Sequence, residues 1–506
     1  MTRPTGSTGP KRPYKVRQAC DACHVRKVRC DGCKPCINCR ETLANCTYLA
    51  VHKKTGPKGG PRHARRLLQR QPAPMPQCAQ FSPSEASSCS QVSRPRRTSD
   101  AAFQPSSRIT HQVIRWCLDA YFKHKYPLTP ILHRETVEQT PVSPEQYGLI
   151  TACCAVISLS PEILPPASPH NELIIPSADF LISETLRARQ YCNLVEHPSL
   201  THIQTSFFLY AAFFSLDQDN SAWYYLREAI TILQTLRLHE EATYSDIDDP
   251  FLATYARRMA WVLFITERGY ALQRNRQITL QITLDVPMVD PSCSGAEILL
   301  GFLDLISLFR HFGADFIANR NSATPGNNED PGHLSTLQSL LKYTLPNVSN
   351  YSQVQQADLL VSRQWLKIIV WKLCASKTLL SSACSEDAMS LHYPVSIARG
   401  IVLASQLVST QAFEANGIGI LEKVFEVACS LADLLSLVPV GGQGSTMDVG
   451  PVDILMEMVR IVGSRFGGSY RHLNILADKA NRCLLMNIDR SLPLPVDDDE
   501  SVDSVN

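Results

Sequence analysis

The chain has 506 residues, of which 44% are hydrophobic and 19% charged, with a formal net charge of +2. This length predicts several domains with real cores, and no apolar run reaches the roughly 18 residues that a membrane helix needs. The start, "MTRPTGSTGPKRP", has no apolar secretory segment. We therefore expect a reducing intracellular compartment and no membrane partner, with cysteines serving as metal ligands or buried thiols.

Positive charge is concentrated at the amino-terminal end. Residues 1–70 hold 17 Lys or Arg and 3 Asp or Glu, a net charge of +14, so the other 436 residues carry 2 − 14 = −12. This asymmetry predicts a basic region that meets a polyanion, attached to a mildly acidic body. Residues 1–17 are expected to be a disordered basic arm.

Seven cysteines follow within residues 18–48. Six of them have the spacing C-x2-C-x6-C-x5-C-x2-C-x6-C, which is a near-repeat of two half-units. Two tetrahedral zinc ions need eight ligand positions, and six thiolates fill eight positions only if two of them bridge both metals. The seventh, Cys33, is predicted to be a bystander, with an overlapping Cys33-x2-Cys36 register as the alternative. The predicted zinc ligands are Cys20, Cys23, Cys30, Cys36, Cys39 and Cys46.

This stretch resembles the fungal Zn2Cys6 binuclear cluster DNA-binding domain, through "CDAC", "RKVRCD", the proline of "KPC" and the aromatic residue of "NCTY". The resemblance implies two short helices, two structural zinc ions and binding to double-stranded DNA. In that family the first and fourth ligands bridge, which here are Cys20 and Cys36. Because the segment has almost no apolar core, zinc would supply its folding energy, on the order of 10–16 kcal/mol.

The segment "HVRKVR", between the second and third ligands, predicts how the domain meets DNA. A short helix there would turn Val25 and Val28 inward. Arg26, Lys27 and Arg29 would then point outward, where basic side chains can bind guanine edges and phosphates.

The resemblance implies that Arg26 and above all Lys27 read a CGG triplet. His24 stands where the family usually has Arg or Lys, so its phosphate contact is expected to be weaker. The further predicted DNA-binding residues are Lys34, Lys53 and Lys54.

Residues 49–70 form a basic extension without sustained heptads, so a long zipper is not expected. Its charges could follow phosphates or act as a nuclear import signal, and a homodimer remains an open possibility. From 71 to 107, 15 of 37 residues are Ser or Pro. Residues 71–108 are therefore predicted to be a disordered linker.

Residues 109–490 are predicted to form a large all-α body, because helical spacing dominates and no alternating strand array appears. "AWYYLREAITILQTLRLHEE" and "RRMAWVLFITERGYALQRNRQITL" resemble the fungal transcription factor regulatory domain, and the second is similar to the maltose and starch activator branch. Charged residues of the second stretch are expected to form ion pairs between helices: Arg257, Arg258, Glu267 and Arg268. Trp223 and Trp261 are expected to be packing residues.

Residues 491–506 form an acidic tail, either a coactivator contact or a solvated terminus. We expect a nuclear, sequence-specific transcription regulator of RNA polymerase II genes, more often an activator. An enzyme is not expected, since no GxSxG, P-loop or dinucleotide fingerprint appears. A thiol-rich metal buffer would leave the basic region unexplained. For target genes, the compact body favours a secondary-metabolite cluster over the alternative, carbohydrate (maltose or starch) utilisation.

Overall fold

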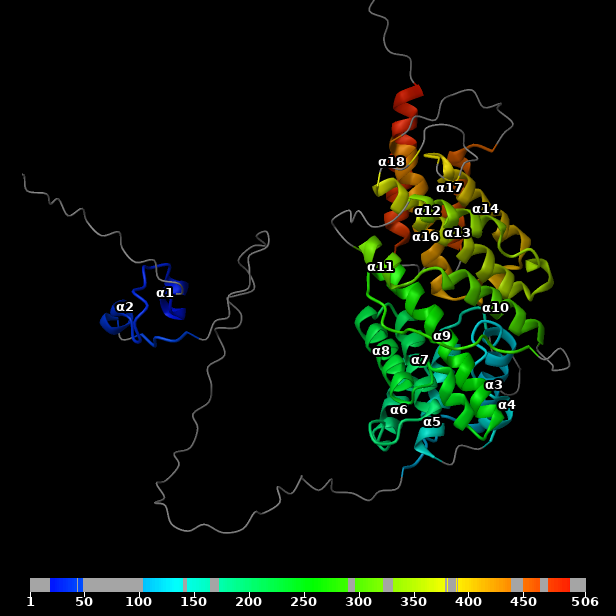
Figure 1. Cartoon of the computed structure of the whole chain (residues 1–506), viewed down its shortest axis with the longest axis horizontal. Helices are drawn as coiled ribbons and strands as arrows, with labels where there is room; N and C mark the ends of the chain where they lie inside the picture. Colours follow the sequence, from blue (N-terminus) through cyan, green and yellow to red (C-terminus); the bar gives the residue numbers. More distant parts are fainter. Residues whose placement is uncertain are drawn as a thin grey trace, which may run out of the picture. The chain divides into compact units, whose positions relative to one another are not determined.

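A computed structural model describes residues 19–42, 44–48, 103–139, 143–163, 173–289, 296–321, 331–377, 380, 388, 390–437, 449–464 and 472–491. The chain divides into two compact units, Met1–Arg97 and Thr98–Asn506 (Figure 1). The predictions for the basic arm, for Lys53 and Lys54, for most of the linker and for nearly all of the acidic tail lie outside the described residues.

The described part of the first unit contains two short helices, α1 (Asp21–Arg26) and α2 (Ile37–Glu41). Each begins directly after a cysteine whose sulfur accepts a backbone N–H bond from the third residue on, as a serine cap would. The interior of the described part consists mainly of sulfur, since the buried residues among 19–42 and 44–48 are all cysteines. The predicted pair of short helices is confirmed.

The described part of the second unit is helical. One β-bridge has both of its residues in the described part, the pair Glu240 and Thr283, and the described residues form no strand. The helices are α3 (His111–Ala120), η1 (Tyr121–Lys125), α4 (Arg134–Val137), α5 (Pro144–Ser158), α6 (Ala178–Arg189), α7 (Leu200–Ser215), α8 (Asp219–Thr235), η2 (Glu241–Asp246), α9 (Pro250–Arg274), α10 (Ala296–Arg310), α11 (Ala314–Asn321), α12 (Pro331–Tyr343), η3 (Val348–Asn350), α13 (Gln353–Ser376), α14 (Tyr393–Leu407), α15 (Thr410–Glu414), α16 (Ile418–Leu437), α17 (Pro451–Ser464) and α18 (Leu473–Ser491).

Local sequence fixes where many of these helices begin. Ser143 caps α5 just before Pro144, and Asp249 caps α9 just before Pro250. A capping oxygen satisfies a free N–H of the first turn, and proline at the first helical position loses no hydrogen bond there. Ser199 caps α7 in the same way. These caps explain why long helices start directly after short polar residues.

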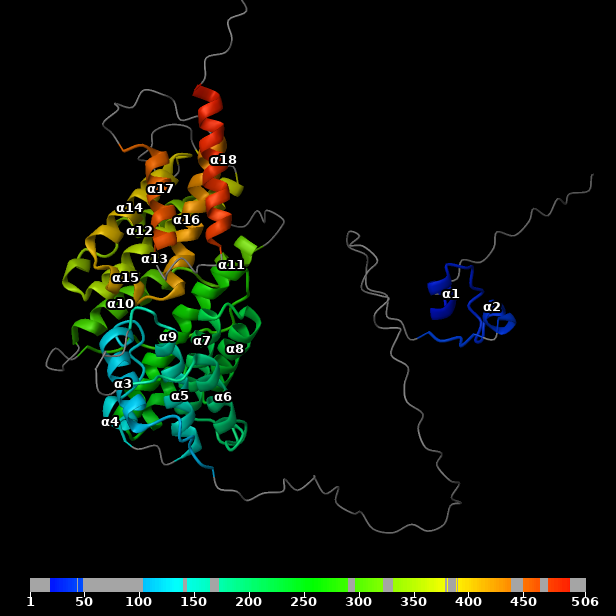
Figure 2. The same ribbon diagram turned by 180° about the vertical axis from the view of Figure 1, so that it is seen from behind.

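The helices pack into two lobes that share one continuous buried core. In the first lobe, α5 packs against α3, α6 and α7, and α7 packs against α8. In the second, α13 packs against α12, α14 and α16, while α16 also contacts α17 and α18. The helix α10 contacts both α9 and α13 and so joins the lobes. Figures 1 and 2 show α5–α8 at one end of this body and α16–α18 at the other, which confirms the predicted all-α architecture for the described residues.

The folded body starts earlier than the predicted boundary at residue 108. The ring of Phe103 lies edge-on to Tyr147 at 5.2 Å and to Tyr191 at 5.3 Å. The guanidinium of Arg187 donates to the carbonyl of Gln104 at 2.9 Å. The linker prediction therefore extends too far, because these aromatic and backbone contacts hold residues 103–108 against the first lobe.

Two of the four charged residues expected to form ion pairs do so. Arg257 pairs with Glu241 (2.6 Å), and Glu267, which is fully buried, pairs with Arg227 of α8 (2.7 Å). The other two arginines make different contacts. Arg258 donates to the Tyr126 hydroxyl (3.0 Å), and Arg268 donates to backbone carbonyls while covering the ring of Phe264.

The two tryptophans lie as packing residues would. Trp261 is 2% exposed and donates its indole N–H to the carbonyl of Asp285. Trp223 is partly buried and stacks on Tyr270, with ring centroids 5.4 Å apart.

Candidate metal centre and nucleic-acid interface

The two half-units of the cysteine cluster repeat one set of hydrogen bonds. In the first half, the N–H of Cys23 donates to the sulfur of Cys20, and the N–H of Cys20 donates to the sulfur of Cys30, both at 3.4 Å. The second half does the same. The N–H of Cys39 donates to the sulfur of Cys36 (3.4 Å), whose own N–H donates to the sulfur of the last cysteine (3.3 Å). The sequence repeat is thus a structural pseudo-twofold.

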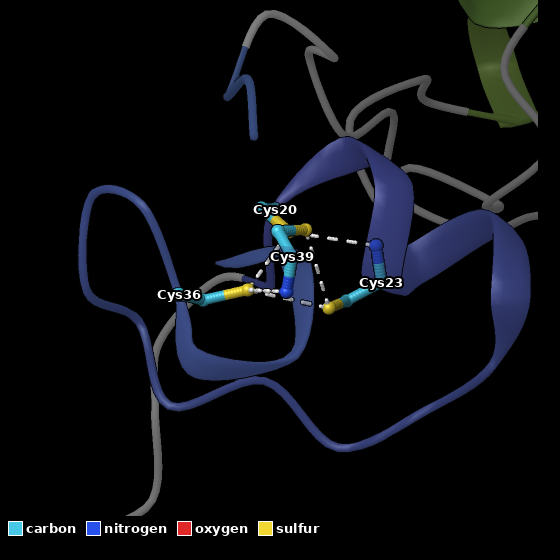
Figure 3. Close-up of side chains that lie close together, drawn as sticks. All are labelled: Cys20, Cys23, Cys36 and Cys39. Carbon is cyan, nitrogen blue, oxygen red and sulfur yellow. Dashed lines mark hydrogen bonds between the residues drawn. The ribbon is translucent and has the colours of Figure 1, made fainter. Parts of the chain in front are cut away.

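Four of the sulfurs gather at the centre of this arrangement, those of Cys20, Cys23, Cys36 and Cys39 (Figure 3). The sulfur of Cys20 lies 3.7 Å from that of Cys36 and 3.6 Å from that of Cys39. The sulfur of Cys23 lies 3.5 Å from that of Cys36 and 4.0 Å from that of Cys39.

These distances suit zinc. With Zn–S bonds of about 2.3 Å, two sulfurs on one tetrahedral zinc ion lie about 3.8 Å apart. An all-thiolate set leaves no position for a catalytic water, so the metal is structural. The donor set therefore fits a closed zinc–sulfur cluster.

The surroundings lower the pKa of some of these thiols, which favours metal binding, and raise the pKa of others. The N–H of Cys23 lowers the pKa of the Cys20 thiol, and the N–H of Cys20 lowers the pKa of Cys30. Burial among the other sulfurs raises the pKa of Cys23 to about 12. Because zinc binds thiolate, loading the cluster must expel the protons that the raised-pKa thiols still hold.

Asp31 organises the loop between the half-units, a role that the sequence analysis did not assign. One carboxylate oxygen accepts the N–H of Cys33 and the other accepts the N–H of Ile37, each at 3.1 Å. The Ile37 bond is the main reason that the pKa of Asp31 is lowered. Asp31 also lies near the sulfurs of Cys30 and Cys36, but these two hydrogen bonds already occupy its oxygens. The sequence offered one signal for this role: Asp31 directly follows Cys30, a predicted zinc ligand.

Tyr48, near the carboxyl end of the cluster segment, contacts residues that lie before it in the cluster. Its hydroxyl donates to the carbonyl of Cys33 at 3.0 Å and lies 3.8 Å from the sulfur of Cys30. The ammonium of Lys34 lies 4.9 Å from the centre of the Tyr48 ring. These two contacts of Tyr48 hold the loop that carries Cys33 and Lys34. The thiol of Cys33 itself is exposed and does not join the four sulfurs described above.

The predicted DNA-binding residues that the structure describes are exposed, but they do not share one helix. Helix α1 ends at Arg26, and Lys27 takes a left-handed conformation (φ 54°) as its C-cap. The N–H of Lys27 bonds to the carbonyls of Cys23 and His24, so its backbone is fixed to a predicted metal ligand. Arg29 follows outside the helix. The described residues of the set are His24, Arg26, Lys27, Arg29 and Lys34.

The prediction that Val25 and Val28 face inward is wrong. Their exposed fractions are 68% and 40%. The helix stops one residue after Val25, which breaks the three-residue spacing argument. In addition, sulfur fills the interior, so no aliphatic side chain is needed there. The valines are therefore exposed, like the basic residues next to them in the sequence.

Two family descriptions match the chain. Residues 18–55 match the fungal Zn(2)-Cys(6) binuclear cluster domain, and residues 118–294 match the fungal specific transcription factor domain. The chain is therefore a fungal zinc cluster transcription factor, and its cluster domain binds two zinc ions through cysteines.

Several known regulators are similar to it. The maltose fermentation regulatory protein MAL13 of Saccharomyces cerevisiae is 24% identical over 96% of this chain and 98% of its own. The probable sucrose utilization protein SUC1 of Candida albicans is 26% identical over 85% and 81%. The C6 finger domain transcription factor hasA of Aspergillus fumigatus is 40% identical, but over only 11% and 13%. The matched families and relatives are regulators. None of the helices in the described ranges combines the length and apolar composition that crossing a bilayer requires.

Proposed function

We propose that the chain is a nuclear regulator, most simply an activator of RNA polymerase II genes, that binds CGG-containing double-stranded DNA through its zinc cluster. The observation that carries this proposal is the placement of Lys27. Its backbone bonds to the carbonyl of Cys23, and its side chain is exposed beside those of Arg26 and His24. A cation on a metal-anchored backbone is pre-ordered to meet guanine N7 and O6.

The same proposal covers the zinc ligands. Cys20 and Cys36 would bridge the two metals, with Cys23 and Cys30 completing one site and the remaining two cysteines the other. Three of the four measured sulfur contacts join pairs that share a zinc ion in this assignment; the 4.0 Å contact between Cys23 and Cys39 does not. The pseudo-twofold supports it further, since Cys20 and Cys36 hold equivalent places in the two halves.

The DNA proposal is tested with zinc-loaded full-length protein. It should bind a CGG-containing duplex more tightly than a scrambled duplex of equal length, and affinity should fall steeply with salt because basic residues displace counterions. Equal affinity for both duplexes at each salt concentration would contradict sequence-specific reading. Arg40→Ala on α2 is a matched control for Lys27→Ala, since it removes one exposed charge from the other half-unit.

For the target genes, the comparisons favour carbohydrate utilisation over the predicted secondary-metabolite cluster. The relatives that cover most of this chain have printed names that refer to maltose and sucrose. The similarity to hasA is confined to about the length of the zinc cluster. The secondary-metabolite prediction has no support among these relatives. Chromatin occupancy tests the choice: enrichment upstream of sugar transporter and glycosidase genes supports it, and enrichment confined to a biosynthetic cluster contradicts it.

Two parts of the proposal rest on the sequence alone. A homodimer would extend the footprint beyond one triplet, and the acidic tail would contact coactivators. The occupancy experiment also reports the spacing of triplets. Paired triplets at a fixed spacing support a dimer, and isolated triplets support a monomer.

A further inference from the structure

A cavity of about 270 Å³ lies where the two lobes of the helical body meet. Helix α7 and the segment η1 contribute one side, and residues 415–419, which lead into α16, contribute the other. A second hollow of about 220 Å³ shares four residues with the first: Leu128, Thr129, Asn416 and Gly419. The first volume is close to the lower end of the range for small-ligand sites, roughly 300–1,000 Å³. The space thus suits a ligand of one or two sugar-sized rings.

One charged residue, Lys125, lines the cavity, and its partner Glu162 lies outside the lining. The ammonium of Lys125 bonds to Glu162 at 2.8 Å and to the carbonyl of Ala415 at 2.8 Å. The side chains of this pair are 11% and 1% exposed. A lysine ammonium has three N–H donors, so one remains after these two bonds. Oxygen Oε2 of Glu162 is buried and has no hydrogen-bond partner among the described residues.

The pair selects against charged ligands. Glu162 neutralises the charge of Lys125, so the cavity wall offers no net charge that would attract an anion or a cation. An uncharged hydroxyl group can instead accept the remaining Lys125 N–H. Buried donors and acceptors left unpaired cost free energy, so a hydroxyl that satisfies them would be favoured.

Aromatic side chains form part of the remaining wall. Five rings line the cavity: Tyr121, Phe207, Phe208, Tyr210 and Phe214. Pyranose sugars present C–H groups on the ring faces and hydroxyl groups at the ring edge. An aromatic wall beside a neutral polar corner matches both parts of such a molecule.

We propose that this cavity between the lobes binds a neutral mono- or disaccharide. The inference deepens the proposed role in carbohydrate utilisation and rests on it for the choice of sugars. A sugar bound here would contact both the matched transcription factor domain and the segment that begins α16. Its occupancy would therefore stabilise the junction of the lobes.

Gly419 allows a direct test. It lies in the first turn of α16, and a Cβ added there would meet no heavy atom within 4 Å. Its φ is outside the left-handed region, so other residues fit its backbone. Gly419→Leu should therefore fill the cavity without a backbone clash. Gly313 is a matched control, since a Cβ there also meets nothing within 4 Å and the residue does not line the cavity.

The experiment uses zinc-loaded full-length protein with D-glucose, maltose or sucrose, and citrate as a charged comparison. Titration calorimetry and thermal unfolding should show saturable binding of at least one sugar with a rise in melting temperature, and no response to citrate. Gly419→Leu should weaken that binding at least tenfold, while Gly313→Leu should leave it unchanged. Ala211→Met fills the cavity from α7 and replaces Gly419→Leu if the latter fails to fold.

Three outcomes would overturn the inference: no response of the native protein to any of the sugars, a response to citrate alone, or undiminished sugar binding in the filled variants. DNA binding is measured on the same samples. If the native protein binds none of the sugars but still recognises CGG, the cavity assignment is rejected and the DNA-binding role stands. Failure of CGG recognition alone would instead reject that role.

Discussion

The Nη1 atom of Arg26 donates to the hydroxyl of Thr42 at 2.9 Å, which links the end of α1 to the residue that follows α2. Thr42 in turn donates to the carbonyl of Asn38 (2.7 Å). One of the two predicted triplet-reading side chains therefore also connects the half-units. Lys27 makes no side-chain hydrogen bond or ion pair with the other described residues, so its charge is available for DNA.

This difference predicts unequal effects of two alanine variants. Lys27→Ala should weaken binding to a CGG duplex by about 1–3 kcal/mol, the typical value of a specific base contact, with unchanged zinc content. Arg26→Ala should weaken it less. Thr42→Val releases Arg26 without removing charge and serves as the control. A larger loss for Arg26→Ala than for Lys27→Ala, measured by fluorescence anisotropy, would contradict this order.

Because Val25 and Val28 are exposed, we expect polar substitutions at both positions to be tolerated. Val25→Ser and Val28→Ser should each change the stability of the zinc-loaded protein by no more than about 0.5 kcal/mol, as is usual at exposed sites. Metal analysis should still find two zinc ions per chain, and resistance to a chelator should be unchanged. Loss of metal in either variant would restore the inward-facing interpretation that the structure contradicts.

The exposed Cys33 predicts a contrast with its neighbour in the sequence. Cys33→Ser should retain two zinc ions per chain, because its thiol is exposed, whereas the sulfurs of Cys30 and Cys46 accept the N–H groups of Cys20 and Cys36. Cys36→Ser should lose metal, because the proposed bridging sulfur serves both sites. Atomic emission analysis of the purified variants measures this directly. Equal metal loss in the two would favour the overlapping register.

The thiol environments predict a pH-dependent zinc affinity. Burial raises the pKa of Cys23 to about 12, so its metal-free thiol is protonated at neutral pH and zinc must displace that proton. Apparent affinity should therefore rise as pH increases from 6 toward 8, with proton release on binding. Calorimetry in two buffers of different ionisation enthalpy counts the protons. Zinc affinity that does not vary with pH would mean that the thiols are already ionised.

In the helical body, the fully buried Glu267 predicts a large stability effect. Its oxygens accept the backbone N–H groups of Thr279 and Leu280 as well as the guanidinium of Arg227. Glu267→Ala should cost on the order of 3–5 kcal/mol, as breaking a buried pair does.

Glu457 provides the matched control for that variant. It pairs with Arg460, but the two side chains are 27% and 63% exposed. Glu457→Ala should cost at most about 1 kcal/mol. Thermal unfolding compares the two variants, and similar midpoints would show that the Glu267 network contributes little.

Cysteine spacing predicted the metal-binding segment because ligand number and geometry constrain sequence directly. Helical periodicity predicted the core of α8 for the same kind of reason: Leu226, Ile230 and Leu233 are all fully buried. The sequence analysis failed where a side chain has several acceptable partners. Arg268 lies among carbonyls and an aromatic ring, and Phe103 packs onto a lobe from within a stretch rich in serine and proline. Such choices depend on contacts distant in sequence.

The pseudo-twofold of the cluster concerns the backbone and the sulfurs, but not the charges. Directly after its second cysteine, the first half-unit presents a run of basic side chains, whereas α2 of the other half offers Arg40 beside Glu41. A module that is symmetric inside but cationic on one side would turn that side to a duplex, and because CGG differs from its own complement, each triplet would fix one direction for the bound module. Each bound copy would therefore have a defined orientation on the DNA. The orientation of the triplets in a promoter would determine whether two copies point toward each other, in the same direction or away from each other.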